Sequence, residues 1–125
     1  MRRRGAGWEI PAAVGVASAA PGRQVVAVVG DGRIAHRAAE LAAAARQEIA
    51  FVLVGLQHPD RGDGTDHLGL MAAVGCAARR VEQPAAIAGA LRWAAVESES
   101  TRRPVLVEVA VADVAAPHLV MADAC

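Results

Sequence analysis

A chain of 125 residues with no net charge at neutral pH is long enough for one domain with one core. Hydrophobic residues make up 54% of the chain but aromatic residues only 2%, so a core rich in small side chains buries little apolar area, and we expect support from a partner surface. The thirteen basic residues balance thirteen acidic ones, which argues against nucleic acid as a partner, and no apolar stretch approaches the roughly 20 residues of a membrane span.

The cysteines and the N-terminus indicate the cytoplasm. Cys76 and Cys125 lie far apart and fit neither a metal-ligand pattern nor a disulfide framework, so a reducing compartment is expected. Cys76 stands between small residues and is predicted to be a core residue rather than a nucleophile. The basic run 2–4 is followed by Glu9 and Pro11, which makes a poor signal peptide.

The first half of the chain alternates between helix and strand. Residues 11–20 read as a small-residue helix, and the β-branched run 24–29 reads as a strand buried on both faces. Gly30-Asp31-Gly32 interrupts that run. Residues 35–47 are strong helix formers, and 49–54 predict a second buried strand.

The second half continues the alternation after a polar, turn-rich loop over residues 55–65. Asp66 is predicted to cap a helix that runs to residue 74. The remaining predicted elements are a strand at 77–82, a helix at 84–96, a strand at 104–109 and an irregular tail at 110–125. Strands alternating with helices predict an α/β fold with a parallel sheet, in which ligands bind beyond the carboxyl ends of the strands. That rule selects the turn 30–32 and the loop 57–60.

Gly30-Asp31-Gly32 lies between a predicted strand and a predicted helix. Glycines there let the backbone approach a ligand, and the following helix can offer free N–H groups to a phosphate. Asp31 would supply a carboxylate to Mg²⁺, which commonly bridges diphosphate oxygens. Taken alone, the three residues are also typical of an ordinary turn at the end of a strand.

The order of motifs along the chain is more specific. The stretch GAGWEIPAAVG (5–15), the run VVAVVGDG, the segment 64–91 and the late run PVLVEVAVADV resemble the diphosphate-binding (PP) domain of thiamine-diphosphate-dependent decarboxylases and carboligases. Within that family, which includes the acetolactate synthases, they look most like the tartronate-semialdehyde synthases (glyoxylate carboligases). The resemblance implies a partial thiamine-diphosphate-binding fold, a parallel sheet with helices on both faces, and a single, incomplete PP domain over residues 1–125.

The resemblance also assigns roles to residues. Asp31 corresponds to a Mg²⁺ ligand, Gly30 and Gly32 to the diphosphate cradle, and Gly7 to backbone near the aminopyrimidine ring. The family's second metal ligand lies in a pair of asparagines, where this chain has Gln57-His58. His58 is therefore a candidate for cofactor and metal contact, although neutral imidazole is a poor Mg²⁺ ligand and an exposed loop histidine is the alternative.

Other residues complete the set of candidates. Asp60 or the Gln57 amide could replace the missing metal ligand. His36 is predicted to be an exposed helix histidine, and His67 to mark a helix start rather than an acid–base pair with Asp66. No catalytic residue is identified.

The resemblance implies a small 2-oxo acid substrate and a decarboxylative condensation that uses thiamine diphosphate with Mg²⁺. The pyrimidine-binding domain of the family is missing, and the segment between the Asn pair and the Asp66 helix is shorter than usual. We therefore expect a domain that is inactive alone. The alternatives are a small subunit of a split enzyme, completed by a pyrimidine-domain subunit or a homo-oligomer, and a non-catalytic α/β module that has lost the cofactor.

Overall fold

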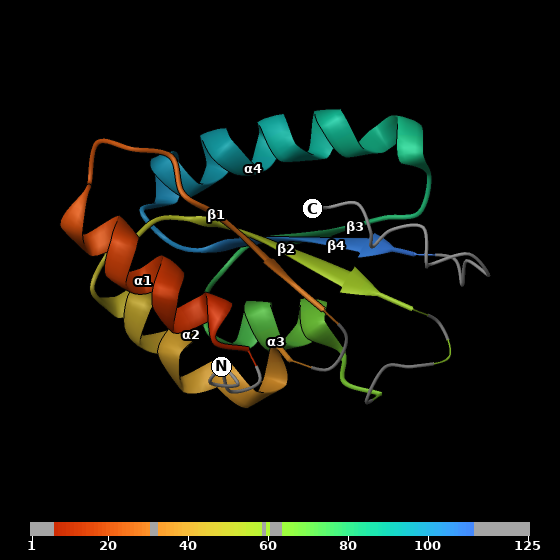
Figure 1. The fold of residues 1–125 in the computed structure, drawn as a ribbon, viewed down its shortest axis with the longest axis horizontal. Coiled ribbons are helices and arrows are strands. Elements are labelled where there is room, and N and C mark those ends of the chain that lie inside the picture. Colours follow the sequence, from red (N-terminus) through yellow and green to blue (C-terminus); the bar gives the residue numbers. More distant parts are fainter. Residues whose placement is uncertain (1–6, 31–32, 59, 61–63, 112–125) are drawn as a thin grey trace, which may run out of the picture.

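The computed structural model describes residues 7–30, 33–58, 60 and 64–111, and in this part of the chain four parallel strands form one sheet (Figure 1). Their order across the sheet is β1-β2-β4-β3. The strands are β1 (Val26–Val29), β2 (Val52–Gln57), β3 (Ala78–Val81) and β4 (Val105–Ala110). The helices are α1 (Glu9–Ala19), α2 (Ala38–Arg46), α3 (His67–Ala73) and α4 (Ile87–Thr101), and the short 3₁₀ helices η1 (Ala35–Arg37) and η2 (Pro84–Ala86) precede α2 and α4. The predicted α/β class and parallel sheet are confirmed.

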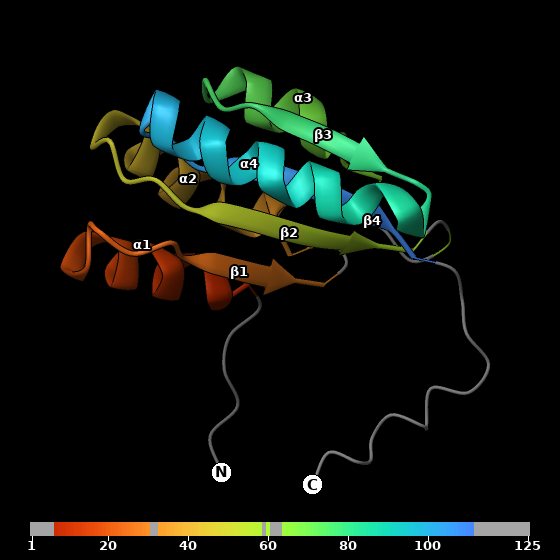
Figure 2. The same ribbon diagram turned by 90° about the horizontal axis from the view of Figure 1, so that it is seen from above.

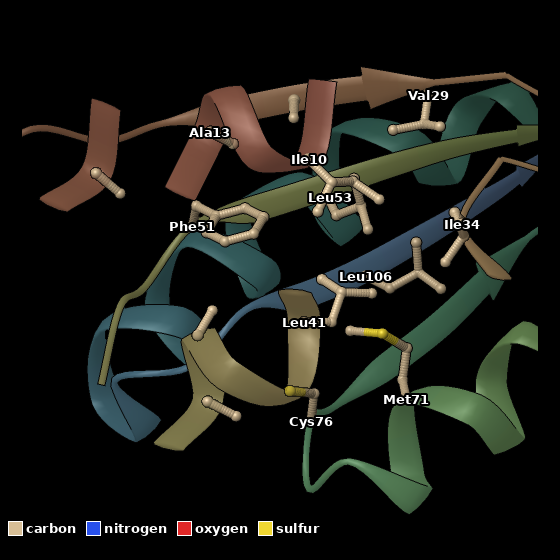
Figure 3. Close-up of a cluster of buried hydrophobic side chains, with 14 residues drawn as sticks. Ile10, Ala13, Val29, Ile34, Leu41, Phe51, Leu53, Met71, Cys76 and Leu106 are labelled. Atoms are coloured by element: carbon tan, nitrogen blue, oxygen red, sulfur yellow. The ribbon is translucent and has the colours of Figure 1, made fainter. Parts of the chain in front are cut away.

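Helices cover both faces of the sheet, as predicted. Figure 1 shows α4 alone on one face and α1, α2 and α3 on the other. Neighbouring residues of a strand point to opposite faces, so Leu53 joins the core under α1 and α2 while Val52 joins the core under α4. Figure 3 shows Phe51, Leu53 and Leu106 in the larger of these two cores.

The prediction that the first strand is buried on both faces is wrong. β1 lies at the edge of the sheet, where α1 covers Ala27 and Val29 but α4 does not reach the opposite face. Val26 and Val28 therefore stay 53% and 52% exposed. A run of β-branched residues predicts a strand, but the position of that strand in the sheet determines how much of it is buried.

The second strand begins and ends three residues later than the predicted 49–54. β2 pairs with β4 from Val52 to Gln57, so its ladder passes through the segment that sequence assigns to a loop. Gly55 is buried within it, and a Cβ atom there would lie 2.9 Å from Ile34 Cδ1. This glycine allows the segment after β1 to pack on β2 and does not mark a turn.

Other boundaries shift as well. The predicted helix at 35–47 opens with the 3₁₀ turn η1, and α4 continues past the predicted end at residue 96 to Thr101. Ser98 is buried there, and its hydroxyl finds an acceptor in the carbonyl of Ala95 (3.0 Å). Asp66 caps α3 as predicted, since its carboxylate accepts from the Gly69 N–H at 3.0 Å. The predicted tail lies outside the described residues from 112 onward, and Ala110 belongs to β4.

None of the described helices combines the length and the hydropathy that a membrane-spanning helix needs.

Helices α2 and α3 end in the same Schellman motif with different residues. In α3 the N–H groups of Gly75 and Cys76 donate to Ala72 and Met71, and Gly75 has φ +79°. In α2 the equivalent position is held by Glu48, with φ 57°. An L-residue pays a steric penalty in this left-handed conformation that glycine avoids.

Glu48→Gly is therefore expected to raise the free energy of unfolding by about 0.5–1 kcal/mol, as relief of the left-handed strain exceeds glycine's entropic cost. Urea denaturation of the wild type and variant measures the change. Glu48→Ala is the control, because it removes the exposed ion pair with Arg102 (3.3 Å) but keeps the strain. A glycine variant no more stable than the alanine variant contradicts the prediction.

Candidate cofactor site

The carboxyl ends of β1 and β2 lie side by side. The register pairs Val29 with Gly55, so Gly30, which follows β1, stands beside the last residues of β2. Asp31 and Gly32 lie outside the described residues. The two segments selected from the sequence therefore meet at one edge of the sheet, which Figure 2 shows as the end toward which all the arrows point.

A tight turn at Gly7 brings the start of α1 to the same edge. Gly7 is buried, has φ +72°, and accepts at its carbonyl oxygen from the Ile10 N–H (3.0 Å). A Cβ atom at this position would lie 2.9 Å from the carbonyl oxygen of Arg33 and 3.0 Å from Cγ of Arg37. Only glycine lets the turn before α1 pack against the segment after β1.

The segment after β1 is held down by Ile34, which is buried and packs at Gly55 of β2. η1 and then α2 follow, so the amino end of this helical segment lies at the carboxyl ends of β1 and β2. Free N–H groups and the helix dipole at such an end favour an anion. His36 is exposed in η1, as predicted.

The proposed metal ligands at the end of β2 are less well defined. Gln57 closes the strand, and its carbonyl oxygen accepts from the Val111 N–H at 2.9 Å. His58 is half-buried and Asp60 is exposed. Within the described ranges, no group of three His, Cys, Asp or Glu side chains is placed to hold a metal ion. The assignments to His58 and Asp60 stay predictions, as does that to Asp31.

A buried polar cluster joins α3 to the sheet, and sequence analysis did not predict it. His67 Nδ1 lies 2.7 Å from Glu108 Oε2, while Glu108 Oε1 accepts from Nε (3.0 Å) and NH2 (2.7 Å) of Arg80. The side chains of His67 and Glu108 are each 1% exposed, and that of Arg80 is 52% exposed. The hydrogen bonds and charge of Glu108 raise the pKa of Arg80 above its ordinary value.

His67 does start a helix, as predicted, but its carboxylate partner is Glu108, which lies 41 residues away. The available signal was a glutamate inside the apolar run of β4, since an acidic residue in a central strand needs a partner. Sequence could not name that partner, because α3, β3 and β4 meet only in the folded chain.

Cys76 is a core residue, as predicted. Burial raises the pKa of its thiol, and the nearby Arg103 opposes that shift more weakly. A thiol of raised pKa is a poor nucleophile.

Comparisons with known proteins agree with this geometry. A family model described as "Thiamine pyrophosphate enzyme, C-terminal TPP binding domain" matches residues 4–58, a range that contains the Gly7 turn, β1 and β2. Glyoxylate carboligase from Escherichia coli O157:H7 is 33% identical over 132 aligned residues, which cover 82% of this chain. The chain belongs to the C-terminal thiamine-diphosphate-binding domains of thiamine-diphosphate-dependent enzymes.

The fold of this thiamine-diphosphate-binding domain has a solved counterpart. The thiamine-diphosphate-dependent 4-hydroxybenzoylformate decarboxylase of Rhodococcus jostii RHA1 superposes with a TM-score of 0.70 at 25% identity, over 85% of this chain. The chain spans 22% of the length of the carboligase and 23% of that of the decarboxylase. The similarity therefore concerns one domain of each larger protein.

The described residues of this domain fit a diphosphate better than they fit a Mg²⁺ ion. Gly7 and Gly30 bring bare backbone to one edge, beside the amino end of a helical segment, and this arrangement suits phosphate oxygens. The oxygen donors that Mg²⁺ prefers are not gathered in the described part of that edge.

Proposed function

We propose that the edge formed by the ends of β1 and β2 binds the diphosphate of thiamine diphosphate. The observation that carries the proposal is that the Gly7 turn packs on the segment after β1, which itself packs on β2 at Gly55, so that these backbone segments lie together at one end of the sheet. Ligands of parallel sheets bind at such ends. The family match over residues 4–58 covers the same three segments.

The individual roles are proposed from the family resemblance and from the residues that stand where the family has its second metal ligand. Gly30 and Gly32 leave room for the phosphates, and Asp31 between them supplies a carboxylate to a Mg²⁺ ion shared with the diphosphate. His58 and Asp60, from the end of β2, complete the metal and cofactor contacts. Gly7 brings the backbone before α1 to the ring end of the cofactor.

The reaction we propose is a decarboxylative condensation of small 2-oxo acids, as the name of the related glyoxylate carboligase suggests. When bound, the cofactor supplies the electron sink for loss of CO₂, and the protein supplies binding and orientation. We propose that residues 1–125 form an incomplete PP domain, inactive alone and completed by a pyrimidine-domain subunit or by oligomerisation. Its share of the relatives' length, under a quarter, supports this reading.

Titration calorimetry tests the cofactor site directly. Thiamine diphosphate with Mg²⁺ is expected to give binding heat with the wild-type chain, and Asp31→Ala is expected to remove it, because the ion that links protein and diphosphate loses its carboxylate. Glu99→Ala, an exposed carboxylate on α4, is the matched control and should bind like the wild type. His58→Ala and Asp60→Ala then show which of the two contributes.

The outcomes separate the candidate functions. Absence of heat for the wild type at millimolar ligand contradicts cofactor binding and favours the non-catalytic module. Binding without glyoxylate consumption, followed by activity once a pyrimidine-domain subunit is added, supports the split enzyme. Activity of the chain alone contradicts the proposal that it is inactive in isolation.

A further inference from the structure

Glu108 places a buried carboxylate near the edge of the sheet at which the proposed cofactor site lies. β4 runs beside β2 with Glu108 level with Gly55, and each of these residues stands two positions before the end of its strand. Residues two positions apart on a strand share a face, so Glu108 lies on the same face as Leu106, whose Cδ1 approaches Gly55. Ile34, from the segment after β1, packs at Gly55 on that face as well, and Figure 3 shows it in one core with Leu106.

The two oxygens of this carboxylate hold two different elements. Oε2 of Glu108 lies 2.7 Å from Nδ1 of His67, while Oε1 accepts two hydrogen bonds from Arg80 of β3. Because a carboxylate can only accept, His67 donates through an N–H at Nδ1. His67 is the first residue of α3, so this hydrogen bond fixes where the helix starts relative to β4.

The segment between β2 and α3 is thereby held at both ends. At its beginning, the chain is held by the pairing of β2 with β4. At its end, the chain is held by the hydrogen bond from His67 to Glu108. Residues 58–66 lie between these two points and include His58 and Asp60, for which we propose metal and cofactor contacts. A displacement of the helix start therefore changes how far these two side chains reach toward the diphosphate.

The chemistry of the contact between His67 and Glu108 suits positioning better than stability. Burying polar and charged groups costs free energy, and well-packed apolar residues of similar volume often give equal or greater stability. A hydrogen bond between an imidazole and a carboxylate, in contrast, has a preferred distance and direction. The side chains of both residues are 1% exposed, so the bond is shielded from bulk water.

We propose that Glu108 is a positioning residue of the cofactor site and that it acts through His67. The carboxylate fixes the start of α3 and, with it, the end of the segment that carries His58 and Asp60. Groups that orient metal-binding residues in this way change metal affinity about 10- to 100-fold. The inference rests on the proposed binding of thiamine diphosphate at this edge and adds a residue that the proposed function does not use.

Variants of His67 test the inference by calorimetric titration of the 125-residue chain with thiamine diphosphate and Mg²⁺. His67→Leu retains a buried side chain but has no donor, and it is expected to weaken binding about tenfold or more. His67→Asn places an amide N–H close to the position of Nδ1, so it keeps the hydrogen bond to Glu108 and should bind like the wild type. His67→Gln moves the amide one carbon further out, so it should weaken binding as leucine does even if the leucine variant fails to fold. Circular dichroism of each variant verifies folding.

Arg80→Met separates positioning from stability. This variant removes the other partner of Glu108 and leaves the hydrogen bond to His67, so the free energy of unfolding should fall while cofactor affinity stays like that of the wild type. Urea denaturation of the His67 and Arg80 variants gives the comparison. A cofactor affinity that falls in parallel with stability in every variant would mean a purely structural role and would overturn the inference.

Amide hydrogen exchange reports on the start of α3 in the absence of cofactor. The Gly69 N–H, which donates to Asp66 in the cap of the helix, should exchange faster in His67→Leu than in His67→Asn. Weakened binding with unchanged exchange at this amide contradicts positioning through the helix start.

The outcomes distinguish this inference from the proposed function. Unchanged affinity in the folded leucine and glutamine variants of His67 overturns the inference and leaves the proposed function standing, as does an equal loss of affinity in the leucine and asparagine variants. Absence of binding heat for the wild type overturns the proposed function, and the inference with it.

Discussion

Glu108→Ala is expected to lower the free energy of unfolding by about 3 kcal/mol, at the lower end of the range for breaking a buried ionic cluster. The carboxylate serves two partners at once, His67 at 2.7 Å and Arg80 at 3.0 and 2.7 Å. Its removal leaves the buried imidazole of His67 without this acceptor. Arg80 is half-exposed and can turn to water, which keeps the loss from reaching the upper end of that range.

Urea denaturation measures this change, with Glu99→Ala as the control for losing an exposed carboxylate on α4. Glu108→Gln retains the shape and one acceptor oxygen, so its loss should be smaller than that of the alanine variant. Equal free energies of unfolding for Glu108→Ala and Glu99→Ala would show that the cluster does not stabilise the packing of α3 on the sheet.

Gly7→Ala is expected to cost about 2 kcal/mol of stability and to weaken cofactor binding about tenfold or more. The residue has φ +72°, and the new methyl group would lie 2.9 Å from the Arg33 carbonyl oxygen, a backbone atom that cannot move aside as a side chain can. The turn before α1 must then shift away from the segment after β1, and these are two of the three segments that line the proposed site.

Gly15→Ala provides the matched control for Gly7→Ala. Gly15 lies within α1, where a Cβ atom meets nothing within 4 Å, so alanine should raise stability by about 0.5–1 kcal/mol. Denaturation and calorimetric titration of both variants give the two readouts. Normal cofactor affinity in a folded Gly7→Ala protein would show that the Gly7 turn does not contribute to cofactor binding. Normal stability of this variant would contradict the prediction that alanine strains the turn.

Much of the fold was predictable because its signals are local. The β-branched runs predicted β1 and β4, and Asp66 predicted the start of α3. Boundaries were less predictable where pairing decides them: β2 extends through Gly55 to Gln57 because β4 continues beside it, and no local property of that segment shows this.

The candidate site divides in the same way. Gly30 was found from sequence because a glycine at the end of a strand allows close backbone approach, and Gly7 was found through the resemblance to the family; the structure places both at one edge. The pairing of His67 with Glu108 joins residues 41 positions apart, so only the packing of α3 on the sheet brings it about.

The sequence by itself determined the alternation of strands and helices, the parallel sheet and the family, because these depend on the order and spacing of local patterns. The tertiary structure alone decided that β1 is an edge strand with Val26 and Val28 exposed, although its β-branched run resembles that of a buried strand. A strand's composition reflects its backbone preference, whereas its burial depends on which elements pack beside it.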